Sequence, residues 1–228
     1  MASSWPRQVV TRTREALLPL ANSERAEEMA RYMKHVAPFL GIPTPPRRLA
    51  LRTQWRDLGA PTSDELGETC LMLMNLRARE YHYAASDLID KFRDVTDRYF
   101  LVEYVQELLT TKSWWDTVDA FGSSAVSPLC WRYDATALVL AWSKSSNLWL
   151  NRAAIQHQRG WKNDTNVPFV LSICDAHSGE HEFFVAKAIG WALRDLARLN
   201  PTAVRKFLKA HPELSMVAVR EARRGLND

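Results

Sequence analysis

The chain has 228 residues, of which 46% are hydrophobic and 25% charged, a balance typical of a globular protein that buries a sizeable core. Eight glycines leave little for the tight turns of an all-β fold, and no apolar run approaches the roughly 20 residues that a membrane span needs. The formal net charge of +4 and the isoelectric point near 9.0 permit a nucleic-acid partner without requiring one.

The three cysteines suit neither a disulfide framework nor a zinc site, because their number is odd and their spacing is wide. Each stands beside apolar residues, so Cys70, Cys130 and Cys174 are predicted to be buried thiols in a reducing, cytoplasmic compartment. The first twenty residues lack the uninterrupted apolar run of a secretory signal. Residues 1–8 are predicted to form a flexible N-terminal extension.

Amphipathic helices with short connectors follow one another along the chain, and no run of alternating strands occurs. The strongest start signal is the capping box of Thr62 and Glu65, which precedes an apolar run. Other predicted starts are Asn22 or Ser23 in residues 22–40, Thr44 before Pro45 in residues 41–55, and Asn200 before Pro201 in residues 199–211.

About a dozen helical segments of ~8–18 residues are predicted, and consecutive pairs make units of about 35–45 residues, the period of HEAT-like repeats. Because these units are not alike in sequence, an irregular helical bundle stays open as an alternative. We predict an all-α fold of one domain, residues 1–228, with HEAT-like repeats stacked into a right-handed superhelical solenoid. Such a stack offers an extended concave surface that suits a long ligand such as DNA.

Residues 111–121, TKSWWDTVDAF, contain two adjacent tryptophans and two aspartates. At 100° per residue, Trp114 shares one helix side with Val118 and Phe121 and is predicted to pack in the core. Trp115 falls on an adjoining side, four residues before Asp119. This phase therefore singles out Trp115 and Asp119 as the pair with chemical potential.

The same phase assigns the other charged residues of this stretch. Lys112 and Asp116 stand four residues apart, so they are predicted to pair at the helix surface, with Asp116 in solvent. Lys112 also lies near Asp119. A solvated or phosphate-contacting role suits Lys112 better than that of a Schiff-base nucleophile, so no lyase activity is expected.

Two further stretches combine aromatic and cationic residues. In residues 186–199, Trp191 lies with Arg194 and Asp195 opposite an apolar stripe, and in residues 145–161, Arg152 and Arg159 line one face. Arginines hold phosphates and aromatic rings contact sugars or bases, so these faces favour nucleic acid. Tryptophan and arginine are also typical hot spots of protein interfaces, so a non-catalytic HEAT-type scaffold that binds protein or DNA structure stays open.

Metal and cofactor chemistry find no support in the sequence. His177 and His181 are four residues apart but straddle Ser178 and Gly179, a predicted loop, which argues against a metal site. No Gly-rich phosphate loop, nucleophile elbow or dinucleotide fingerprint occurs. Neither a metal nor a cofactor is predicted.

Four segments, TKSWWDTVD, LWLNRAAI, FFVAKAIGWALRDLARLNP and MARYMKHVAPFLGIPTPPRR, together resemble the AlkD-like DNA alkylation repair family. The resemblance runs from about residue 23 to 225. It implies a monofunctional DNA glycosylase of HEAT-like repeats, and a monomer is our default expectation. Such an enzyme excises cationic N3- and N7-alkylpurines, including 3-methyladenine, 7-methylguanine and bulky adducts, from duplex DNA without a closed base pocket.

The resemblance also implies roles for individual residues. Asn151 stands where a basic residue is expected before the catalytic arginine, which leaves one phosphate contact and the substrate range in doubt. The implied catalytic residues are Trp115, Asp119 and Arg152; the implied DNA contacts are Trp191 against the deoxyribose, Tyr32 as a further aromatic and Arg194 at the backbone. Lys112 and Arg159 are added as candidate DNA contacts from their own faces.

Overall fold

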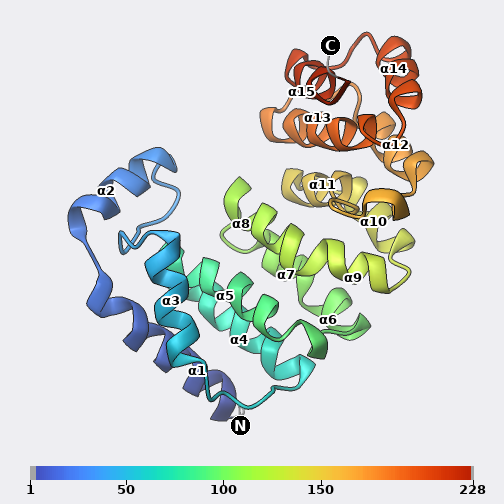
Figure 1. The fold of residues 1–228 in the computed structure, drawn as a ribbon. Helices are drawn as coiled ribbons and strands as arrows, with labels where there is room; N and C mark the ends of the chain where they lie inside the picture. Colours follow the sequence, from blue (N-terminus) through green and yellow to red (C-terminus); the bar gives the residue numbers. More distant parts are fainter. Residues whose placement is uncertain (1–3, 227–228) are drawn as a thin grey trace. The chain divides into compact units, whose positions relative to one another are not determined.

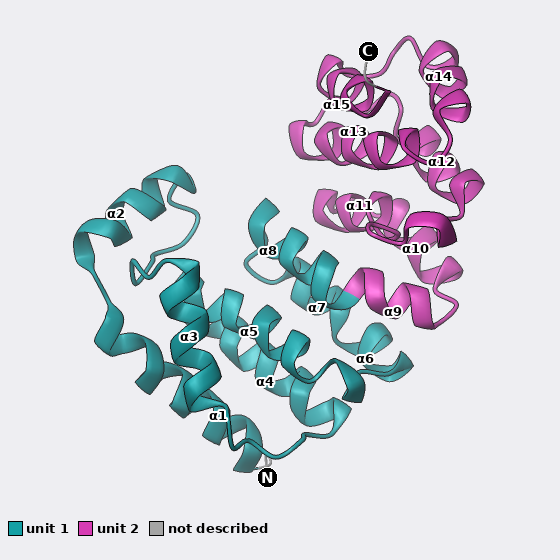
Figure 2. Ribbon diagram, viewed as in Figure 1, with its two compact units in different colours: residues 1–125 teal, residues 126–228 magenta. Residues whose placement is uncertain are grey.

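The computed structural model describes residues 4–226, which are 73% helical and contain no strand (Figure 1). The all-α prediction is therefore confirmed. The chain divides into two compact units, residues 1–125 (unit 1) and residues 126–228 (unit 2), shown in Figure 2. The single-domain organisation stays a prediction. None of the helices in residues 4–226 combines the length and apolar character that a membrane crossing requires.

Unit 1 is built around the packing of α4 on α5, with α1 packed against α3 and α4. Leu66, Leu73 and Leu88 are fully buried between these helices. A π-helical turn, Gly122–Val126, follows the last helix of the unit. The helices of unit 1 are α1 (Ser4–Leu17), α2 (Ser23–Tyr32), α3 (Thr44–Gln54), α4 (Ser63–Asn75), α5 (Arg79–Lys91), α6 (Arg98–Glu103), α7 (Val105–Thr110) and α8 (Trp115–Phe121).

In unit 2, α13 is the central helix and packs against α11, α12, α14 and α15. Gly190 makes the α13–α15 contact possible, because a Cβ there would lie 2.6 Å from the Cβ of Glu221. The helices of unit 2 are α9 (Ser127–Arg132), α10 (Thr136–Ser143), α11 (Leu148–Ile155), α12 (Val167–Ala176), α13 (Phe183–Ala197), α14 (Pro201–Ala210) and α15 (Met216–Leu226).

Three of the four predicted caps are confirmed. The side chains of Asn22, Thr62 and Asn200 each accept a backbone N–H of the first helical turn, and Glu65 completes the capping box. The fourth was wrong by one residue. Thr44 is already helical, and the preceding proline occupies the cap position, where its carbonyl oxygen accepts the N–H of residue 47 at 3.1 Å.

The prediction of a flexible extension was wrong for residues 4–8, which form the start of α1. The indole of Trp5 donates a hydrogen bond to the carbonyl of Gly59 at 3.0 Å and meets the ring of Phe92 edge-on. Two anchors on distant parts of unit 1 thus hold this turn. Residues 1–3 lie outside the described part of the chain.

The three cysteines are buried and unbridged, as predicted. Burial raises the pKa of Cys130 and Cys174 to about 12, and also raises that of Cys70. These thiols therefore stay protonated and are poor nucleophiles.

Because two histidines are buried, we expect the stability of the fold to fall at acidic pH. Burial lowers the pKa of His82 and His157 from 6.5 to about 4, whereas histidines of the unfolded chain protonate near 6.5. The unfolded state therefore binds more protons between these pH values, so stability is complete above pH 6.5 and falls toward pH 4. The loss is about 3 kcal/mol per histidine at the lower limit.

Urea unfolding between pH 7.5 and 4.5 measures this loss. We expect His82→Gln to flatten the dependence of the unfolding free energy on pH, while the exposed His181→Gln leaves it as in the wild type. An unchanged slope in His82→Gln would contradict the assignment.

Candidate nucleic-acid interface

Helix α8 presents two of the residues implied to be catalytic. The helix begins at Trp115, and Trp114 caps it in extended backbone with a φ of −154°. Val118 and Phe121 face the core, as predicted. Trp115 and Asp119 lie one turn apart and are both partly exposed, so the ring and the carboxylate share one side of the helix.

The second acid of α8 was misassigned. Asp116 does not lie in solvent but accepts the guanidinium of Arg79 from α5, with an Nε–Oδ2 distance of 3.0 Å. The Tyr83 hydroxyl donates to the same carboxylate. The two charged side chains are only 1% and 9% exposed. This buried ion pair ties the first turn of α8 to α5.

Lys112 does not pair with Asp116, because it precedes the helix and has a φ of +46°. Its ammonium instead donates to the carbonyls of Asn75 and Leu76, both at 2.8 Å. Cations stabilise helix C-termini, and these carbonyls end α4. Lys112 thus holds α4 to the start of α8.

Both tryptophans pack against buried hydrophobic residues, so the prediction that only Trp114 packs was wrong. They cover the same small apolar cluster while remaining partly exposed. Tyr32, the last residue of α2, is 74% exposed. The buried residues of the cluster are Ala30, Met33 and Phe39.

In unit 2, three arginines converge on the indole of Trp191. The guanidinium carbons of Arg152, Arg159 and Arg194 lie 5.0, 5.1 and 5.8 Å from the ring centroid. Each distance suits a cation–π contact. We call these four residues the arginine–tryptophan cluster. Three like charges around one ring repel one another, so the cluster favours an anionic partner such as phosphate.

The members of the cluster differ in exposure. Arg152 is 1% exposed, and its Nη1 donates to the carbonyl of Phe184 at 2.7 Å. Arg159 is exposed. Because Arg152 is buried and held, its geometry fits the positioning of Trp191, whereas Arg159 offers the accessible guanidinium.

Asn151, where a basic residue was expected, has a structural role. It is buried, and its amide nitrogen donates to the carbonyls of Trp142, Ser143 and Ser145 at 3.1, 3.2 and 2.9 Å. These carbonyls end α10. Asn151 therefore fixes α10 beside α11 and does not face a DNA backbone.

Arg194 is anchored by Glu221 of α15, a residue that sequence reasoning missed. The carboxylate of Glu221 is 4% exposed and accepts hydrogen bonds from Arg194, Lys187 and Arg224, each at 2.7 Å. Burial raises the pKa of Glu221, but the hydrogen bond from Lys187 and the three positive charges outweigh burial, and the pKa is lowered overall. Glu221 thus stays ionised and fixes Arg194 beside the ring of Trp191.

Replacing Glu221 with glutamine should lower the free energy of unfolding by about 2 kcal/mol at neutral pH, because three cations then face a neutral amide. The stabilisation depends on the ionised carboxylate, so it is present above the unfolded pKa and disappears as the pH falls. Urea unfolding measures both effects. The exposed Glu28→Gln on α2 is the control and should leave the free energy of unfolding close to that of the wild type. Equal losses in the two variants would argue against the anchor.

The structure gathers the predicted residues within each unit. In unit 2 all four meet in the arginine–tryptophan cluster, and in unit 1 Trp115 and Asp119 share one side of α8, whereas Lys112 turns to α4. The predicted site residues in unit 1 are Tyr32, Lys112, Trp115 and Asp119, and the predicted site residues in unit 2 are Arg152, Arg159, Trp191 and Arg194.

Comparison with known proteins places these residues in a family. The profile of the DNA alkylation repair enzyme family matches residues 13–226. A structure described as a predicted DNA alkylation repair enzyme from Enterococcus faecalis is 30% identical, with a TM-score of 0.75 over 90% of this chain and 95% of that one. No curated protein sequence matches the chain.

Two more distant structures share the fold. A protein from Streptococcus mutans UA159 is 15% identical, with a TM-score of 0.61 over 97% of this chain and 98% of its own. AlkD2 from Streptococcus mutans is 19% identical, with a TM-score of 0.60 over 88% and 98%. The likeness to AlkD2 confirms the HEAT-like helical fold. The chain belongs to the DNA alkylation repair enzyme family.

Proposed function

We propose that the protein is a monofunctional DNA glycosylase that removes cationic N3- and N7-alkylpurines from duplex DNA and leaves an abasic site. The observation that carries the proposal is the pairing of Trp115 and Asp119 on one side of α8. The other acid of that helix, Asp116, is buried in an ion pair. Family membership supports a role in DNA repair, and the carboxylate beside an aromatic ring supports the reaction type.

The alkylated purine supplies much of the driving force. Its positive charge makes it a good leaving group, so the bond between C1′ and the purine nitrogen breaks with both electrons going to the base. Positive charge then develops on the deoxyribose as an oxocarbenium-like species. A carboxylate aimed at that charge stabilises the transition state, and we assign this task to Asp119.

Water completes the reaction at C1′. We also assign to Asp119 the task of orienting the attacking water and accepting its proton, which then passes to solvent. The product is the free neutral base and an abasic sugar. The ammonium of Lys112 donates hydrogen bonds to two backbone carbonyls. Because this lysine is engaged there, we expect no lysine attack on the sugar and no lyase step.

The aromatic and cationic residues position the DNA. In unit 1, the π-face of Trp115 suits contact with an electron-poor sugar, and Tyr32 offers a further exposed ring. In unit 2, Trp191 offers an aromatic face to DNA. Arg152 and Arg194 hold the indole of Trp191. Arg159 is the group that we assign to a backbone phosphate, where a guanidinium binds through two parallel hydrogen bonds.

Base release tests the proposal directly. Duplex DNA treated with a methylating agent is incubated with the protein, and free 7-methylguanine and 3-methyladenine are measured by chromatography. We expect both bases to appear, with intact abasic strands and no borohydride-trapped adduct. Failure to release either base from a panel of N3- and N7-adducted duplexes would refute the glycosylase activity.

A non-catalytic scaffold is the second candidate, since clustered tryptophan and arginine also suit a protein interface. The dependence of DNA affinity on salt concentration distinguishes the glycosylase from the protein-binding scaffold. DNA binding through phosphates releases counterions, so affinity for undamaged duplex should fall with added NaCl, and Arg159→Ala should reduce the slope of log K against log salt by about 1. Fluorescence anisotropy measures the slope, with the exposed Lys206→Ala as control. A salt-independent affinity would favour the protein scaffold.

A further inference from the structure

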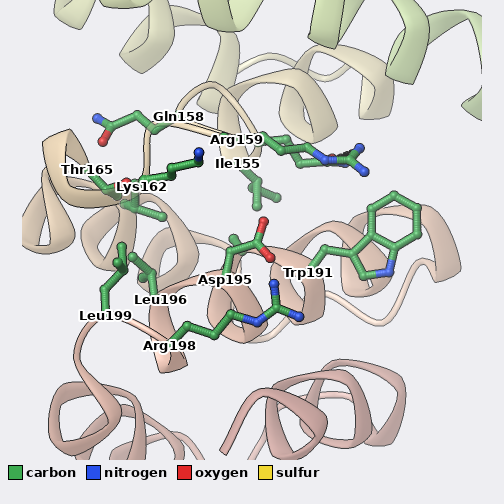
Figure 3. A pocket seen from close by; sticks show the side chains of 14 residues that line it. Ile155, Gln158, Arg159, Lys162, Thr165, Trp191, Asp195, Leu196, Arg198 and Leu199 are labelled. Carbon is green, nitrogen blue, oxygen red and sulfur yellow. Dashed lines mark hydrogen bonds between the residues drawn. The ribbon is translucent and has the colours of Figure 1, made fainter.

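Unit 2 contains a cavity beside the arginine–tryptophan cluster, and two members of that cluster, Arg159 and Trp191, are among its lining residues. Its volume is about 380 Å³, within the range of small-molecule sites. It lies between the end of α11, the loop that leads to α12 and the second half of α13, and Trp191 closes one side (Figure 3). Its apolar lining comes from Ile155, Val170, Leu196 and Leu199.

Charged side chains enter this cavity without partners of their own. Lys162 and Asp195 reach in from opposite sides, and Arg198 lies beside Asp195 (Figure 3). Within residues 4–226, none of these three side chains makes an ion pair or a side-chain hydrogen bond, unlike Asp116 and Glu221. With Arg159, which also lines it, the cavity presents three cationic side chains and one anionic acceptor to a ligand.

A fourth polar group points to the same conclusion. The amide nitrogen of Gln156, which also lines the cavity, is buried and has no hydrogen-bond partner within the described residues. Leaving a buried donor unsatisfied costs free energy that an acceptor atom of a bound ligand would recover. The side-chain oxygen of Gln156 is already used, since it accepts from Arg159 at 3.4 Å.

We propose that this cavity binds one mononucleotide. The phosphate pairs with Lys162, on the side of the cavity opposite Asp195, and the flat base lies on the apolar lining beside Trp191. A ring nitrogen accepts from Gln156, and an exocyclic amine donates to Asp195. Inorganic phosphate would leave the apolar lining uncovered, and a nucleoside without phosphate would leave Lys162 unpaired, so a nucleotide fits these groups better than either part alone.

Two sources could supply this ligand, a free mononucleotide or a nucleotide displaced from bound DNA. The second source rests on the proposed function, whereas binding of free nucleotide does not. The two are separated by measuring the free nucleotide first, in a protein that need not act on DNA.

Isothermal titration of the full chain with dAMP tests the site. We expect saturable one-site binding that is at least 10-fold tighter than for inorganic phosphate or deoxyadenosine. Lys162→Met should weaken dAMP binding at least 10-fold, and Asp195→Asn should weaken dAMP several-fold while leaving phosphate unchanged. The exposed Lys206→Met on α14 is the matched control and should bind as the wild type does. Equal affinity for dAMP and phosphate, or no effect of Lys162→Met, would overturn the proposal.

Duplexes that carry 2-aminopurine beside an abasic-site analogue then identify the source. A fluorescence change on binding that Lys162→Met removes and added dAMP reverses would assign the site to displaced nucleotides of DNA. If dAMP binds but the 2-aminopurine signal is the same in Lys162→Met, the site serves free nucleotide. The release of methylated bases is scored separately, so a failure of the glycosylase proposal leaves the dAMP result interpretable.

Discussion

Asp119→Asn should release methylated bases about 10²- to 10³-fold more slowly than the wild type while still binding DNA. The substitution keeps the shape of the side chain and removes its negative charge. If the carboxylate stabilises positive charge that develops on the sugar, an amide of the same size cannot replace it. A loss of this size corresponds to about 3–4 kcal/mol of transition-state stabilisation.

Folding and binding should survive this change. Asp119 is only partly buried, so neither the core nor the Arg79–Asp116 ion pair is disturbed. Removing an acid from a surface that meets phosphates should leave affinity for abasic-site DNA unchanged or slightly higher. Single-turnover release of 7-methylguanine and anisotropy with an abasic-site analogue measure the two properties on the same preparations.

The control for this experiment is an exposed acid without a role in the site. Asp94→Asn, in the short turn after α5, should release bases at the wild-type rate. Equal release by Asp119→Asn and the wild type would remove Asp119 from the catalytic step. Loss of DNA binding together with activity would point to a structural role instead.

Local periodicity in the sequence predicts what depends on a single helix. On α13, Ile189 and Leu193 are fully buried and Trp191 is partly exposed, as the phase required. The same holds for Val118 and Phe121 on α8. These assignments succeed because a helix exposes and buries residues with a fixed period.

The helical periodicity gave a wrong prediction where the chain is not helical. The pairing of Lys112 with Asp116 requires a helix over residues 111–116, but Lys112 has a positive φ and the helix begins only at Trp115. A spacing of four residues therefore does not bring these two side chains together. Nothing near Asp116 in the sequence indicates Arg79, which lies 37 residues earlier. Its partner becomes visible only when α5 packs against α8.

Contacts between helices explain the other omissions. Glu221 lies 27 residues after Arg194, and only the packing of α15 on α13 brings the two together. The sequence predicts that Asn151 costs the protein a phosphate contact. In the structure its side-chain amide instead donates to backbone carbonyls at and just after the end of α10. The residues that line the cavity of unit 2 come from three separate segments, so no pattern within one stretch of the sequence predicts it. The sequence predicts which residues share one side of a helix, but it does not predict which helices pack against that side.

Arg79→Met should lower the free energy of unfolding by about 3–5 kcal/mol, the largest effect on stability that we expect. The guanidinium is 1% exposed and donates to Asp116, to Thr117 and to the backbone carbonyl of Lys112. Methionine matches the length of the side chain but supplies no donor. The carboxylate of Asp116 is then left buried beside a neutral thioether, with only the Tyr83 hydroxyl to satisfy it.

A second variant separates the unpaired charge from the lost packing. In Arg79→Met with Asp116→Leu, no buried charge remains, so stability should recover by at least half of the loss, because apolar replacements of buried ion pairs are often well tolerated. Asp90→Asn, which breaks a surface pair with Arg93, should change stability by less than about 1 kcal/mol. Urea unfolding at pH 7.5 measures all three variants. An equal loss in the single and double variants would show that packing, and not the ion pair, holds α8 in place.

The same double variant links stability to the site. Asp116 and Asp119 are three residues apart on α8, and the Arg79 contact fixes the turn from which Trp115 projects. If that contact positions the site, the double variant should recover stability yet release bases more slowly than the wild type, because a leucine contact orients α8 less strictly than two directed hydrogen bonds. If release returns fully with stability, the ion pair serves folding alone, and the orientation of α8 must come from the packing of Trp114 and Trp115 on the apolar cluster of Ala30, Met33 and Phe39.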